Sequence, residues 1–245
     1  MRPVERILTR LRFPERRRRR IIDEFHRLYY ESSRQTWKNT RWLGVRAYKT
    51  PLDLWVYQEL LVRVKPELII ETGTSEGGSA LFLATVCDLL GCGEILTIDT
   101  ASRGRRAPPD AERPRHARVT YLKGSSTAPE TLKTVAARAR DKSPIMVVLD
   151  SSHTFQHVLD ELRHYADFVT PGSYLVVEDT NLNGHPILPD LGPGPTEAVQ
   201  QFLAERSDFA PDREQEKFLL TFNPGGYLRR QPRSMGEAAS PTKGV

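Results

Sequence analysis

The sequence has few of the residues that stabilise small secreted proteins or cross membranes. Only two of its 245 residues are cysteines, Cys87 and Cys92, too few for a framework of disulfide bonds. No apolar run approaches the roughly 20 residues that span a bilayer. No apolar segment follows the arginines near the start, so we expect neither a signal peptide nor a membrane association. These absences favour a cytoplasmic protein whose two thiols are buried and reduced.

The first residues of the chain account for its net positive charge. Residues 1–20 hold nine arginines against Glu5 and Glu15, a net charge of +7, whereas the whole chain carries +5. The remaining residues therefore carry about −2 (5 − 7), and the basic character belongs to an arm rather than to the main domain. We divide the chain into a basic arm (residues 1–39), one domain (40–230) and a disordered tail (231–245).

The arm itself predicts an amphipathic helix. Arg16–Arg20 are five consecutive arginines, and apolar residues follow at helical spacing: Ile21, Ile22, Phe25, Leu28 and Tyr29. Such a run could bind nucleic acid or anionic lipid, but aromatic-rich RNA motifs are lacking elsewhere. We therefore expect the apolar stripe to pack on the domain or on a second subunit, which would make the protein a homo-oligomer. Binding to nucleic acid is not expected.

From residue 67 onwards, strand and helix patterns alternate. Apolar segments that predict strands end at residues 71, 99, 123, 150 and 179, and helical patterns lie between them. Residues 218–222 and 227–229 predict a C-terminal antiparallel hairpin, and residues 101–116 predict a mobile surface loop. The alternation predicts an α/β fold with a mostly parallel sheet, helices on both faces and ligands at the carboxyl ends of the strands.

The first of these strands leads into a glycine-rich turn, Glu71–Ser79, which is followed by a helix. Glycines let the backbone approach a ligand closely, and the start of a helix offers free N–H groups. A dinucleotide-binding turn needs a glycine where this chain has Ser75. The carboxylate of Glu71 would repel a pyrophosphate but attract an amino group, which favours S-adenosylmethionine. A turn with a purely structural role remains the alternative.

Acidic residues recur at the strand ends that form one rim of the sheet: Glu71, Asp99, Asp150, Glu178 and Asp179. Asp99 follows the second strand, where a carboxylate can accept hydrogen bonds from both ribose hydroxyls. Ser125 and Ser126, after the third strand, could border an adenine ring. The alternative for each is a residue that caps a turn.

Asp150, Glu178 and Asp179 form a second group of acids that predicts a magnesium site. Neighbouring carboxylates repel one another unless a cation lies between them, and oxygen ligands favour a hard ion such as Mg²⁺. Consecutive strand residues point to opposite faces, so Glu178 and Asp179 can share an ion only if the chain leaves the sheet there. His153, three residues after Asp150, could take a proton from a substrate. His157 and His185 are weaker candidates for the same role.

Several of these segments together resemble the cephalosporin-hydroxylase-type family of class I S-adenosylmethionine-dependent O-methyltransferases, which includes macrolide-sugar and rhamnosyl methyltransferases. The similarity covers residues 40–230 and is carried by Tyr48–Glu59, Glu71–Ser79, Asp150–His153, Val176–Asp179 and Pro193–Ala198. The resemblance implies a Rossmann-like fold with a seven-stranded sheet. It also implies that residues 40–50 and 180–195 close over the substrate.

The same resemblance implies roles for individual residues. Mg²⁺ would be held by Asp150, Glu178 and Asp179, with His153 as the general base. Glu71, Gly73, Ser79 and Asp99 would contact the cofactor. Their neighbours Thr74, Ser125, Ser126 and Asp150 complete the predicted cofactor-binding set.

The sequence therefore predicts a Mg²⁺-dependent O-methyltransferase. It would move the methyl group of S-adenosylmethionine to a hydroxyl of a small molecule, either a secondary metabolite or a sugar. Three alternatives remain open. A non-haem iron hydroxylase needs two histidines and a carboxylate, a nicotinamide oxidoreductase needs the missing glycine, and a non-enzymatic scaffold using the arginine arm leaves the acidic rim unexplained.

Overall fold

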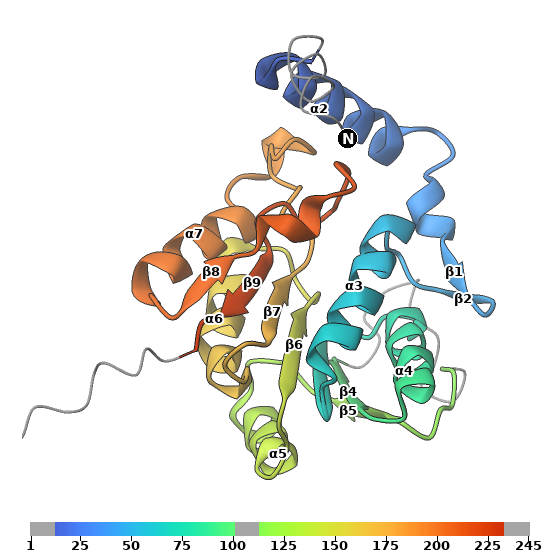
Figure 1. Cartoon of the computed structure of the whole chain (residues 1–245), viewed down its shortest axis with the longest axis vertical. Coiled ribbons are helices and arrows are strands. Elements are labelled where there is room, and N and C mark those ends of the chain that lie inside the picture. Colours follow the sequence, from blue (N-terminus) through green and yellow to red (C-terminus); the bar gives the residue numbers. More distant parts are fainter. Residues whose placement is uncertain (1–12, 101–112, 233–245) are drawn as a thin grey trace, which may run out of the picture.

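A seven-stranded sheet forms the centre of the computed structural model, which describes residues 13–100 and 113–232 (Figure 1). The strand order is β5-β4-β3-β6-β7-β9-β8. The first five strands in this order are parallel, whereas β9 runs antiparallel to both β7 and β8. The strands are β3 (Leu68–Thr72), β4 (Glu94–Asp99), β5 (Val119–Lys123), β6 (Ile145–Leu149), β7 (Tyr174–Val177), β8 (Phe209–Pro211) and β9 (Tyr227–Arg230). The predicted fold class is confirmed.

Helices cover both faces of this sheet and divide the core into two clusters. The helices are α3 (Pro51–Val64) and α4 (Gly78–Leu90) on one face, and α5 (Pro129–Ala139), α6 (Phe155–Tyr165) and α7 (Pro195–Glu205) on the other. Ile69 packs with α3 and α4, whereas its neighbour Ile70 packs with the helices of the opposite face. All residues of β3 and β6 are buried, including the polar Glu71 and Thr72 at the end of β3, as expected for central parallel strands.

Local signals in the sequence explain where the helices on the first face begin and end. The Thr50 side chain accepts a hydrogen bond from the backbone N–H of Leu52 at 3.2 Å, so Thr50 is the N-cap of α3. Pro51 follows at the first helical position. Gly77 and Gly91, both with positive φ, flank α4.

The C-terminal hairpin exists, but its first strand lies elsewhere than predicted. β9 pairs with β8 (Phe209–Pro211), and residues 218–222 form no strand. Leu219 has a φ of +72°, which interrupts extended backbone, and Phe222 donates its N–H to Asp53 of α3 at 2.9 Å. Tertiary hydrogen bonds therefore replace strand pairing in this apolar segment.

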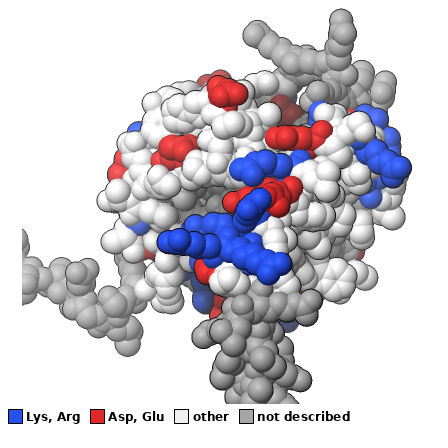
Figure 2. Space-filling view, turned by 90° about the horizontal axis from the view of Figure 1, so that it is seen from above, with Lys and Arg blue, Asp and Glu red and all other residues white. Residues whose placement is uncertain are grey.

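The N-terminal arm contains the predicted helix, α2 (Glu15–Glu31), which lies beyond the carboxyl edge of the sheet (Figure 1). Arg16–Arg20 are exposed on its first turns. Seen from above, Lys and Arg side chains gather in bands on this face of the molecule, with acidic groups between them (Figure 2). Among the described residues, no helix has the length and apolar character needed to cross a membrane.

The segment after α2 is more ordered than the predicted loop. It contains a short 3₁₀ helix, η1 (Thr36–Asn39), and a two-stranded antiparallel sheet of β1 (Arg41–Trp42) and β2 (Val45–Arg46). Cys87 and Cys92 are both free, but only Cys87 is buried. The predicted mobile loop and disordered tail fall largely outside the described residues, as do residues 1–12 of the arm.

Candidate active site

A cavity of about 510 Å³ opens at the carboxyl edge of the parallel strands, a size typical of small-molecule sites. Residues from five separate strand ends line it, as expected for ligand sites in sheets of this type. It brings together most of the predicted site residues: Gly73, Thr74, Ser79, Asp99, Ser125, Ser126, Asp150, His153 and Asp179. Glu71 and Glu178 are not among the residues that line it.

The glycine-rich turn packs tightly against the end of β6. Gly73 has a φ of +88°, and a Cβ atom built there would lie 1.8 Å from the carbonyl oxygen of Asp150. Only glycine allows this close approach, which sets the turn and Asp150 side by side. The Thr74 hydroxyl forms a hydrogen bond of 2.7 Å with that of Thr97 on β4. The turn is therefore fixed from two neighbouring strands.

Glu71 lies beneath this turn and is completely buried. Its Oε2 accepts a hydrogen bond from the Thr97 hydroxyl at 2.6 Å, whereas Oε1 is buried without a hydrogen-bond partner among the described residues. Burial raises the pKa of Glu71. A buried carboxylate oxygen without a partner is the kind of atom that a donor group of a ligand can satisfy.

Asp99 lies at the end of β4, on the cavity wall. Its Oδ2 accepts the backbone N–H of Ser75 at 2.9 Å and lies 3.6 Å from the guanidinium of Arg113. Both contacts are made by Oδ2, and Oδ1 takes part in neither of them. The position suits a residue that binds ribose hydroxyls.

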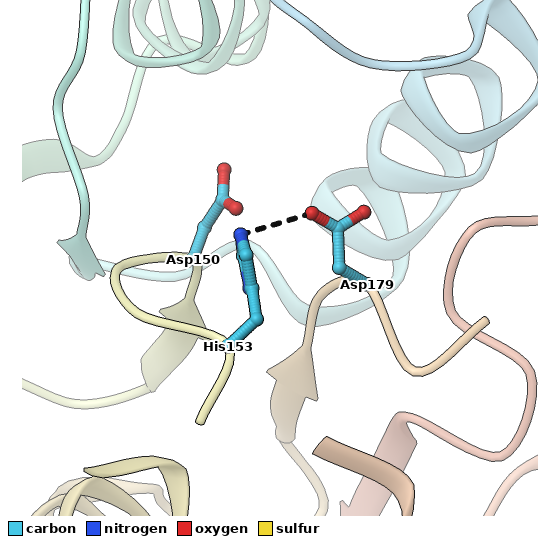
Figure 3. A group of neighbouring side chains, drawn as sticks. All are labelled: Asp150, His153 and Asp179. Atoms are coloured by element: carbon cyan, nitrogen blue, oxygen red, sulfur yellow. Dashed lines mark ion pairs between the residues drawn. The ribbon is translucent and has the colours of Figure 1, made fainter. Parts of the chain in front are cut away.

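Asp150, His153 and Asp179 form a compact group that lines the cavity (Figure 3). One possible ligand atom from each lies within 4.8 Å of the others. His153 Nε2 lies 3.1 Å from Asp179 Oδ2. Asp179 has a φ of +58°, and its N–H bonds to Asn223 Oδ1 at 3.1 Å, so the chain leaves the sheet at this residue. Glu178 itself pairs with Lys49 and is not part of the group of Asp150, His153 and Asp179, so its sharing of an ion with Asp179 stays a prediction.

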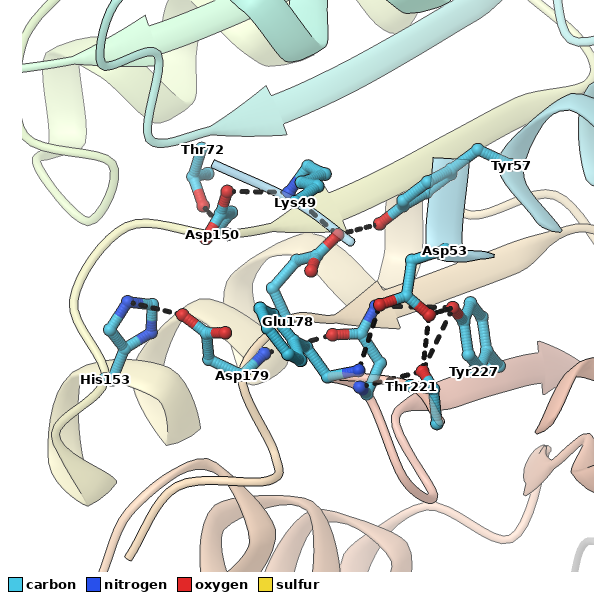
Figure 4. A network of polar contacts seen from close by, with 12 residues as sticks. Lys49, Asp53, Tyr57, Thr72, Asp150, His153, Glu178, Asp179, Thr221 and Tyr227 are labelled. Carbon is cyan, nitrogen blue, oxygen red and sulfur yellow. Dashed lines mark hydrogen bonds and ion pairs between the residues drawn. The ribbon is translucent and has the colours of Figure 1, made fainter. Parts of the chain in front are cut away.

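Glu178 takes part in a buried ion pair that the sequence did not reveal. The ammonium of Lys49 lies 2.8 Å from Asp150 Oδ2 and 2.9 Å from Glu178 Oε1, and the Tyr57 hydroxyl also donates to Glu178 Oε1 (Figure 4). Both contacts of Glu178 engage Oε1 and leave Oε2 outside them. Lys49 belongs to a motif that we used for the family resemblance, but no pattern in the sequence indicated that it reaches Asp150 and Glu178, which lie more than 100 positions away.

Burial changes the charge state of this group. It raises the pKa of Asp150 to about 7, although Lys49 opposes the change. Asp53, which accepts hydrogen bonds from Thr221, Phe222 and Tyr227, has its pKa raised to about 7, mainly by burial and further by Glu178. The pKa of the Lys49 ammonium is raised overall: burial by itself would lower this pKa, but the negative charges of Asp150 and Glu178 outweigh the effect of burial.

The two weaker histidine candidates differ in position. His157 lines the cavity, but its Nε2 is engaged by the Ser151 hydroxyl at 2.9 Å and lies 3.4 Å from Glu161. His185 Nε2 contacts Glu197 at 2.6 Å, and His185 does not line the cavity. His153 is therefore the histidine that the structure places beside both Asp150 and Asp179.

The strand order, with an antiparallel strand inserted beside β7, and the glycine turn after β3 are those of the class I methyltransferase fold. The chain matches the family described as rhamnosyl O-methyltransferase/CmcI over residues 34–231, and it belongs to that family. It is accordingly an S-adenosylmethionine-dependent O-methyltransferase, as the sequence predicted.

Relatives and solved structures agree with this assignment. The chain is 37% identical over 215 residues to the rhamnosyl O-methyltransferase of Mycobacterium tuberculosis (strain H37Rv), a match that covers 86% of this chain and 85% of that protein. It is 38% identical over 216 residues to the rhamnosyl O-methyltransferase of Mycobacterium leprae (strain TN), covering 86% and 91%. A solved structure of CmcI-D160 with Mg and SAM shares the fold, with a TM-score of 0.60 and 19% identity over 80% of this chain and 78% of that one.

Proposed function

We propose that this protein transfers the methyl group of S-adenosylmethionine to a hydroxyl of a small sugar-bearing molecule, with Mg²⁺ as a second cofactor. One observation carries the proposal. A single cavity is lined by the glycine turn and Asp99 and by the group of Asp150, His153 and Asp179. The names of the curated relatives favour a sugar hydroxyl as acceptor. The acceptor could also be another secondary-metabolite alcohol, which an acceptor screen would reveal.

The described residues fit the cofactor. Gly73, Thr74 and Ser79 place backbone and hydroxyl groups along the cavity at the start of α4, where free N–H groups gather. We assign Asp99 to the ribose, and Ser125 and Ser126 to the adenine side. Glu71 supports the turn from below through Thr97, and because it does not line the cavity we assign it to holding the turn rather than to direct contact with the cofactor.

The residues also fit Mg²⁺, because the donors are carboxylate oxygens with one imidazole. We assign Asp150 and Asp179 to the ion, together with Oε2 of Glu178, the oxygen that neither Lys49 nor Tyr57 engages. When bound, the ion supplies a positive charge that lowers the pKa of the acceptor hydroxyl. A non-haem iron site would need two histidines and one carboxylate, the reverse of the group observed.

Proton transfer falls to His153. The methyl carbon leaves sulfur and forms a bond with the acceptor oxygen, and the hydroxyl proton passes to the imidazole. Neutral S-adenosylhomocysteine is the other product. Asp179 Oδ2, at 3.1 Å from Nε2, orients the ring and stabilises the imidazolium that forms. The sulfonium is already activated, so orientation and proton removal are the main contributions of the protein.

Calorimetric titration with S-adenosylhomocysteine, with and without Mg²⁺ and with NADH as a control, tests the cofactor. We expect micromolar binding of S-adenosylhomocysteine and none of NADH. Methyl transfer from labelled S-adenosylmethionine to a panel of glycosides then tests the acceptor class. A folded protein that binds S-adenosylhomocysteine in neither condition would overturn the assignment of the cavity.

We further propose that the protein is cytoplasmic and forms a homo-oligomer through its arm. Ile21, Phe25 and Leu28 leave an apolar stripe on α2, each between 44% and 67% exposed, which a second subunit could cover. Size-exclusion chromatography with light scattering, comparing the wild type with Phe25→Glu, tests this assembly. A monomeric wild type would contradict it.

A further inference from the structure

Two aromatic residues of the N-terminal arm line the cavity of the methyltransferase domain. Tyr30, at the end of α2, and Trp37, in η1, lie more than 30 residues before the glycine turn, yet both belong to the cavity wall. Their rings stack at a centroid distance of 4.7 Å with an interplanar angle of 18°. The Trp37 indole N–H also donates to the Tyr30 carbonyl oxygen at 3.1 Å. The two rings therefore form a fixed aromatic wall.

The aromatic wall is connected to the loop that follows Asp179 through Phe222 and His26. Phe222 contacts both rings edge-on, at 5.5 Å from Tyr30 and 5.9 Å from Trp37. His26 of α2 stacks on Phe222 at 5.7 Å, and its Nε2 lies 2.9 Å from the amide nitrogen of Asn181, two residues after Asp179. These contacts are buried or half-buried, so the arm and the proposed metal loop are positioned together.

Position within the cavity separates the aromatic wall from the predicted cofactor residues. Tyr30 is close enough to Asp179 for that carboxylate to add to the effect of burial, and both raise the pKa of the tyrosine. Leu182, on the loop after Asp179, extends the apolar lining. The cofactor turn, by contrast, presents glycine, serine and threonine. The aromatic wall thus lies on the Asp179 side, where an acceptor hydroxyl must come to reach His153.

We propose that Tyr30 and Trp37 form the acceptor subsite: Tyr30 covers one face of the Trp37 indole, and the outer face of this pair stacks against the apolar C–H face of a glycosyl ring, beside the Lys38 ammonium at 5.1 Å from the Trp37 ring centroid. A sugar ring presents C–H groups on one face and directs its hydroxyls to the sides, and the negative face of an aromatic ring attracts such C–H groups. A rigid aromatic pair loses little conformational entropy when a ring stacks on it. This inference rests on the proposed function, because it takes the other side of the cavity as the cofactor site. The N-terminal arm would then form part of the active site and not a separate element of the protein.

The test measures sugar binding apart from cofactor binding. Wild-type protein saturated with S-adenosylhomocysteine is titrated with methyl α-L-rhamnopyranoside, and binding is followed by calorimetry and by tryptophan fluorescence. Trp37→Leu should weaken sugar binding by about 3- to 10-fold, the range expected for loss of one aromatic stacking contact. Trp37→Phe should retain most of the affinity, and S-adenosylhomocysteine affinity should change less than about twofold in both variants, in keeping with the separate subsites.

Trp55→Leu is the matched control, since Trp55 is 59% exposed on α3 and does not line the cavity. It should leave sugar binding unchanged. Failure of the wild type to bind S-adenosylhomocysteine would refute the proposed function itself. If S-adenosylhomocysteine binds but the sugar does not, or if Trp37→Leu and Trp37→Phe both bind the sugar as the wild type does, the acceptor subsite is wrong and the cofactor assignment stands.

Discussion

Replacing Lys49 by methionine should destabilise the fold far more than removing an ordinary lysine. The Lys49 side chain is only 4% exposed, and its ammonium contacts two carboxylates at 2.8 and 2.9 Å. Methionine preserves most of the apolar stem but leaves Asp150 and Glu178 facing each other without a cation. Breaking a buried ion pair by removing one partner costs about 3–5 kcal/mol. Asp150 is 23% exposed, and its raised pKa of about 7 lets it take up a proton and lose its charge when Lys49 is absent. We therefore expect a destabilisation at the lower end of the 3–5 kcal/mol range, about 3 kcal/mol.

Urea denaturation followed by tryptophan fluorescence measures this effect. A loss of about 3 kcal/mol corresponds to a midpoint lower by about 1 M, for an m-value near the upper end of the usual range for urea. Lys142→Met is the matched control, because Lys142 pairs with Glu94 at 3.3 Å on the surface, with both side chains at least one-third exposed. That variant should lose less than about 1 kcal/mol. Equal destabilisation of the two variants would refute the reasoning that the Lys49 pair is buried and coupled.

Three further outcomes follow from the site. Asp150→Asn should lower turnover at least about 100-fold, while its S-adenosylhomocysteine affinity, measured by calorimetry, stays within about threefold of the wild type. If turnover and S-adenosylhomocysteine affinity fell by the same factor, Asp150 would serve the cofactor rather than Mg²⁺. His153→Ala should lower turnover by about 10²- to 10⁴-fold with Mg²⁺ affinity retained, and a parallel loss of Mg²⁺ binding would make His153 a ligand instead of the base. Mg²⁺ binds the ionised form of Asp150, whose pKa is raised to about 7. The affinity of the protein for Mg²⁺ should therefore fall as the pH drops below 7, by up to about tenfold per pH unit. A Mg²⁺ affinity that is constant from pH 5 to 8 would contradict the raised pKa.

Features that depend on neighbouring residues in the chain could be predicted from the sequence. Thr50 and Pro51 are local signals for the start of α3, because an N-cap is formed by residues two positions apart. The end of β4 at Asp99 was predicted to the residue, since the apolar residues of a buried parallel strand lie close together in the chain. The hairpin was placed wrongly because residues 218–222 have the pattern of a strand, yet Asp53, about 170 positions earlier, takes the hydrogen bonds that a strand would use.

The sequence by itself determined the fold class, the family and the gathering of acidic strand ends at one edge of the sheet. Repeated strand and helix patterns allow few topologies, and parallel strands place their carboxyl ends together. Only the tertiary structure decided which acids share a partner. Lys49 joins Asp150 to Glu178, whereas His153 pairs with Asp179. It also decided that Tyr30 and Trp37 enter the cavity. These contacts join residues far apart in the chain, and they depend on side-chain directions and packing that no local pattern encodes.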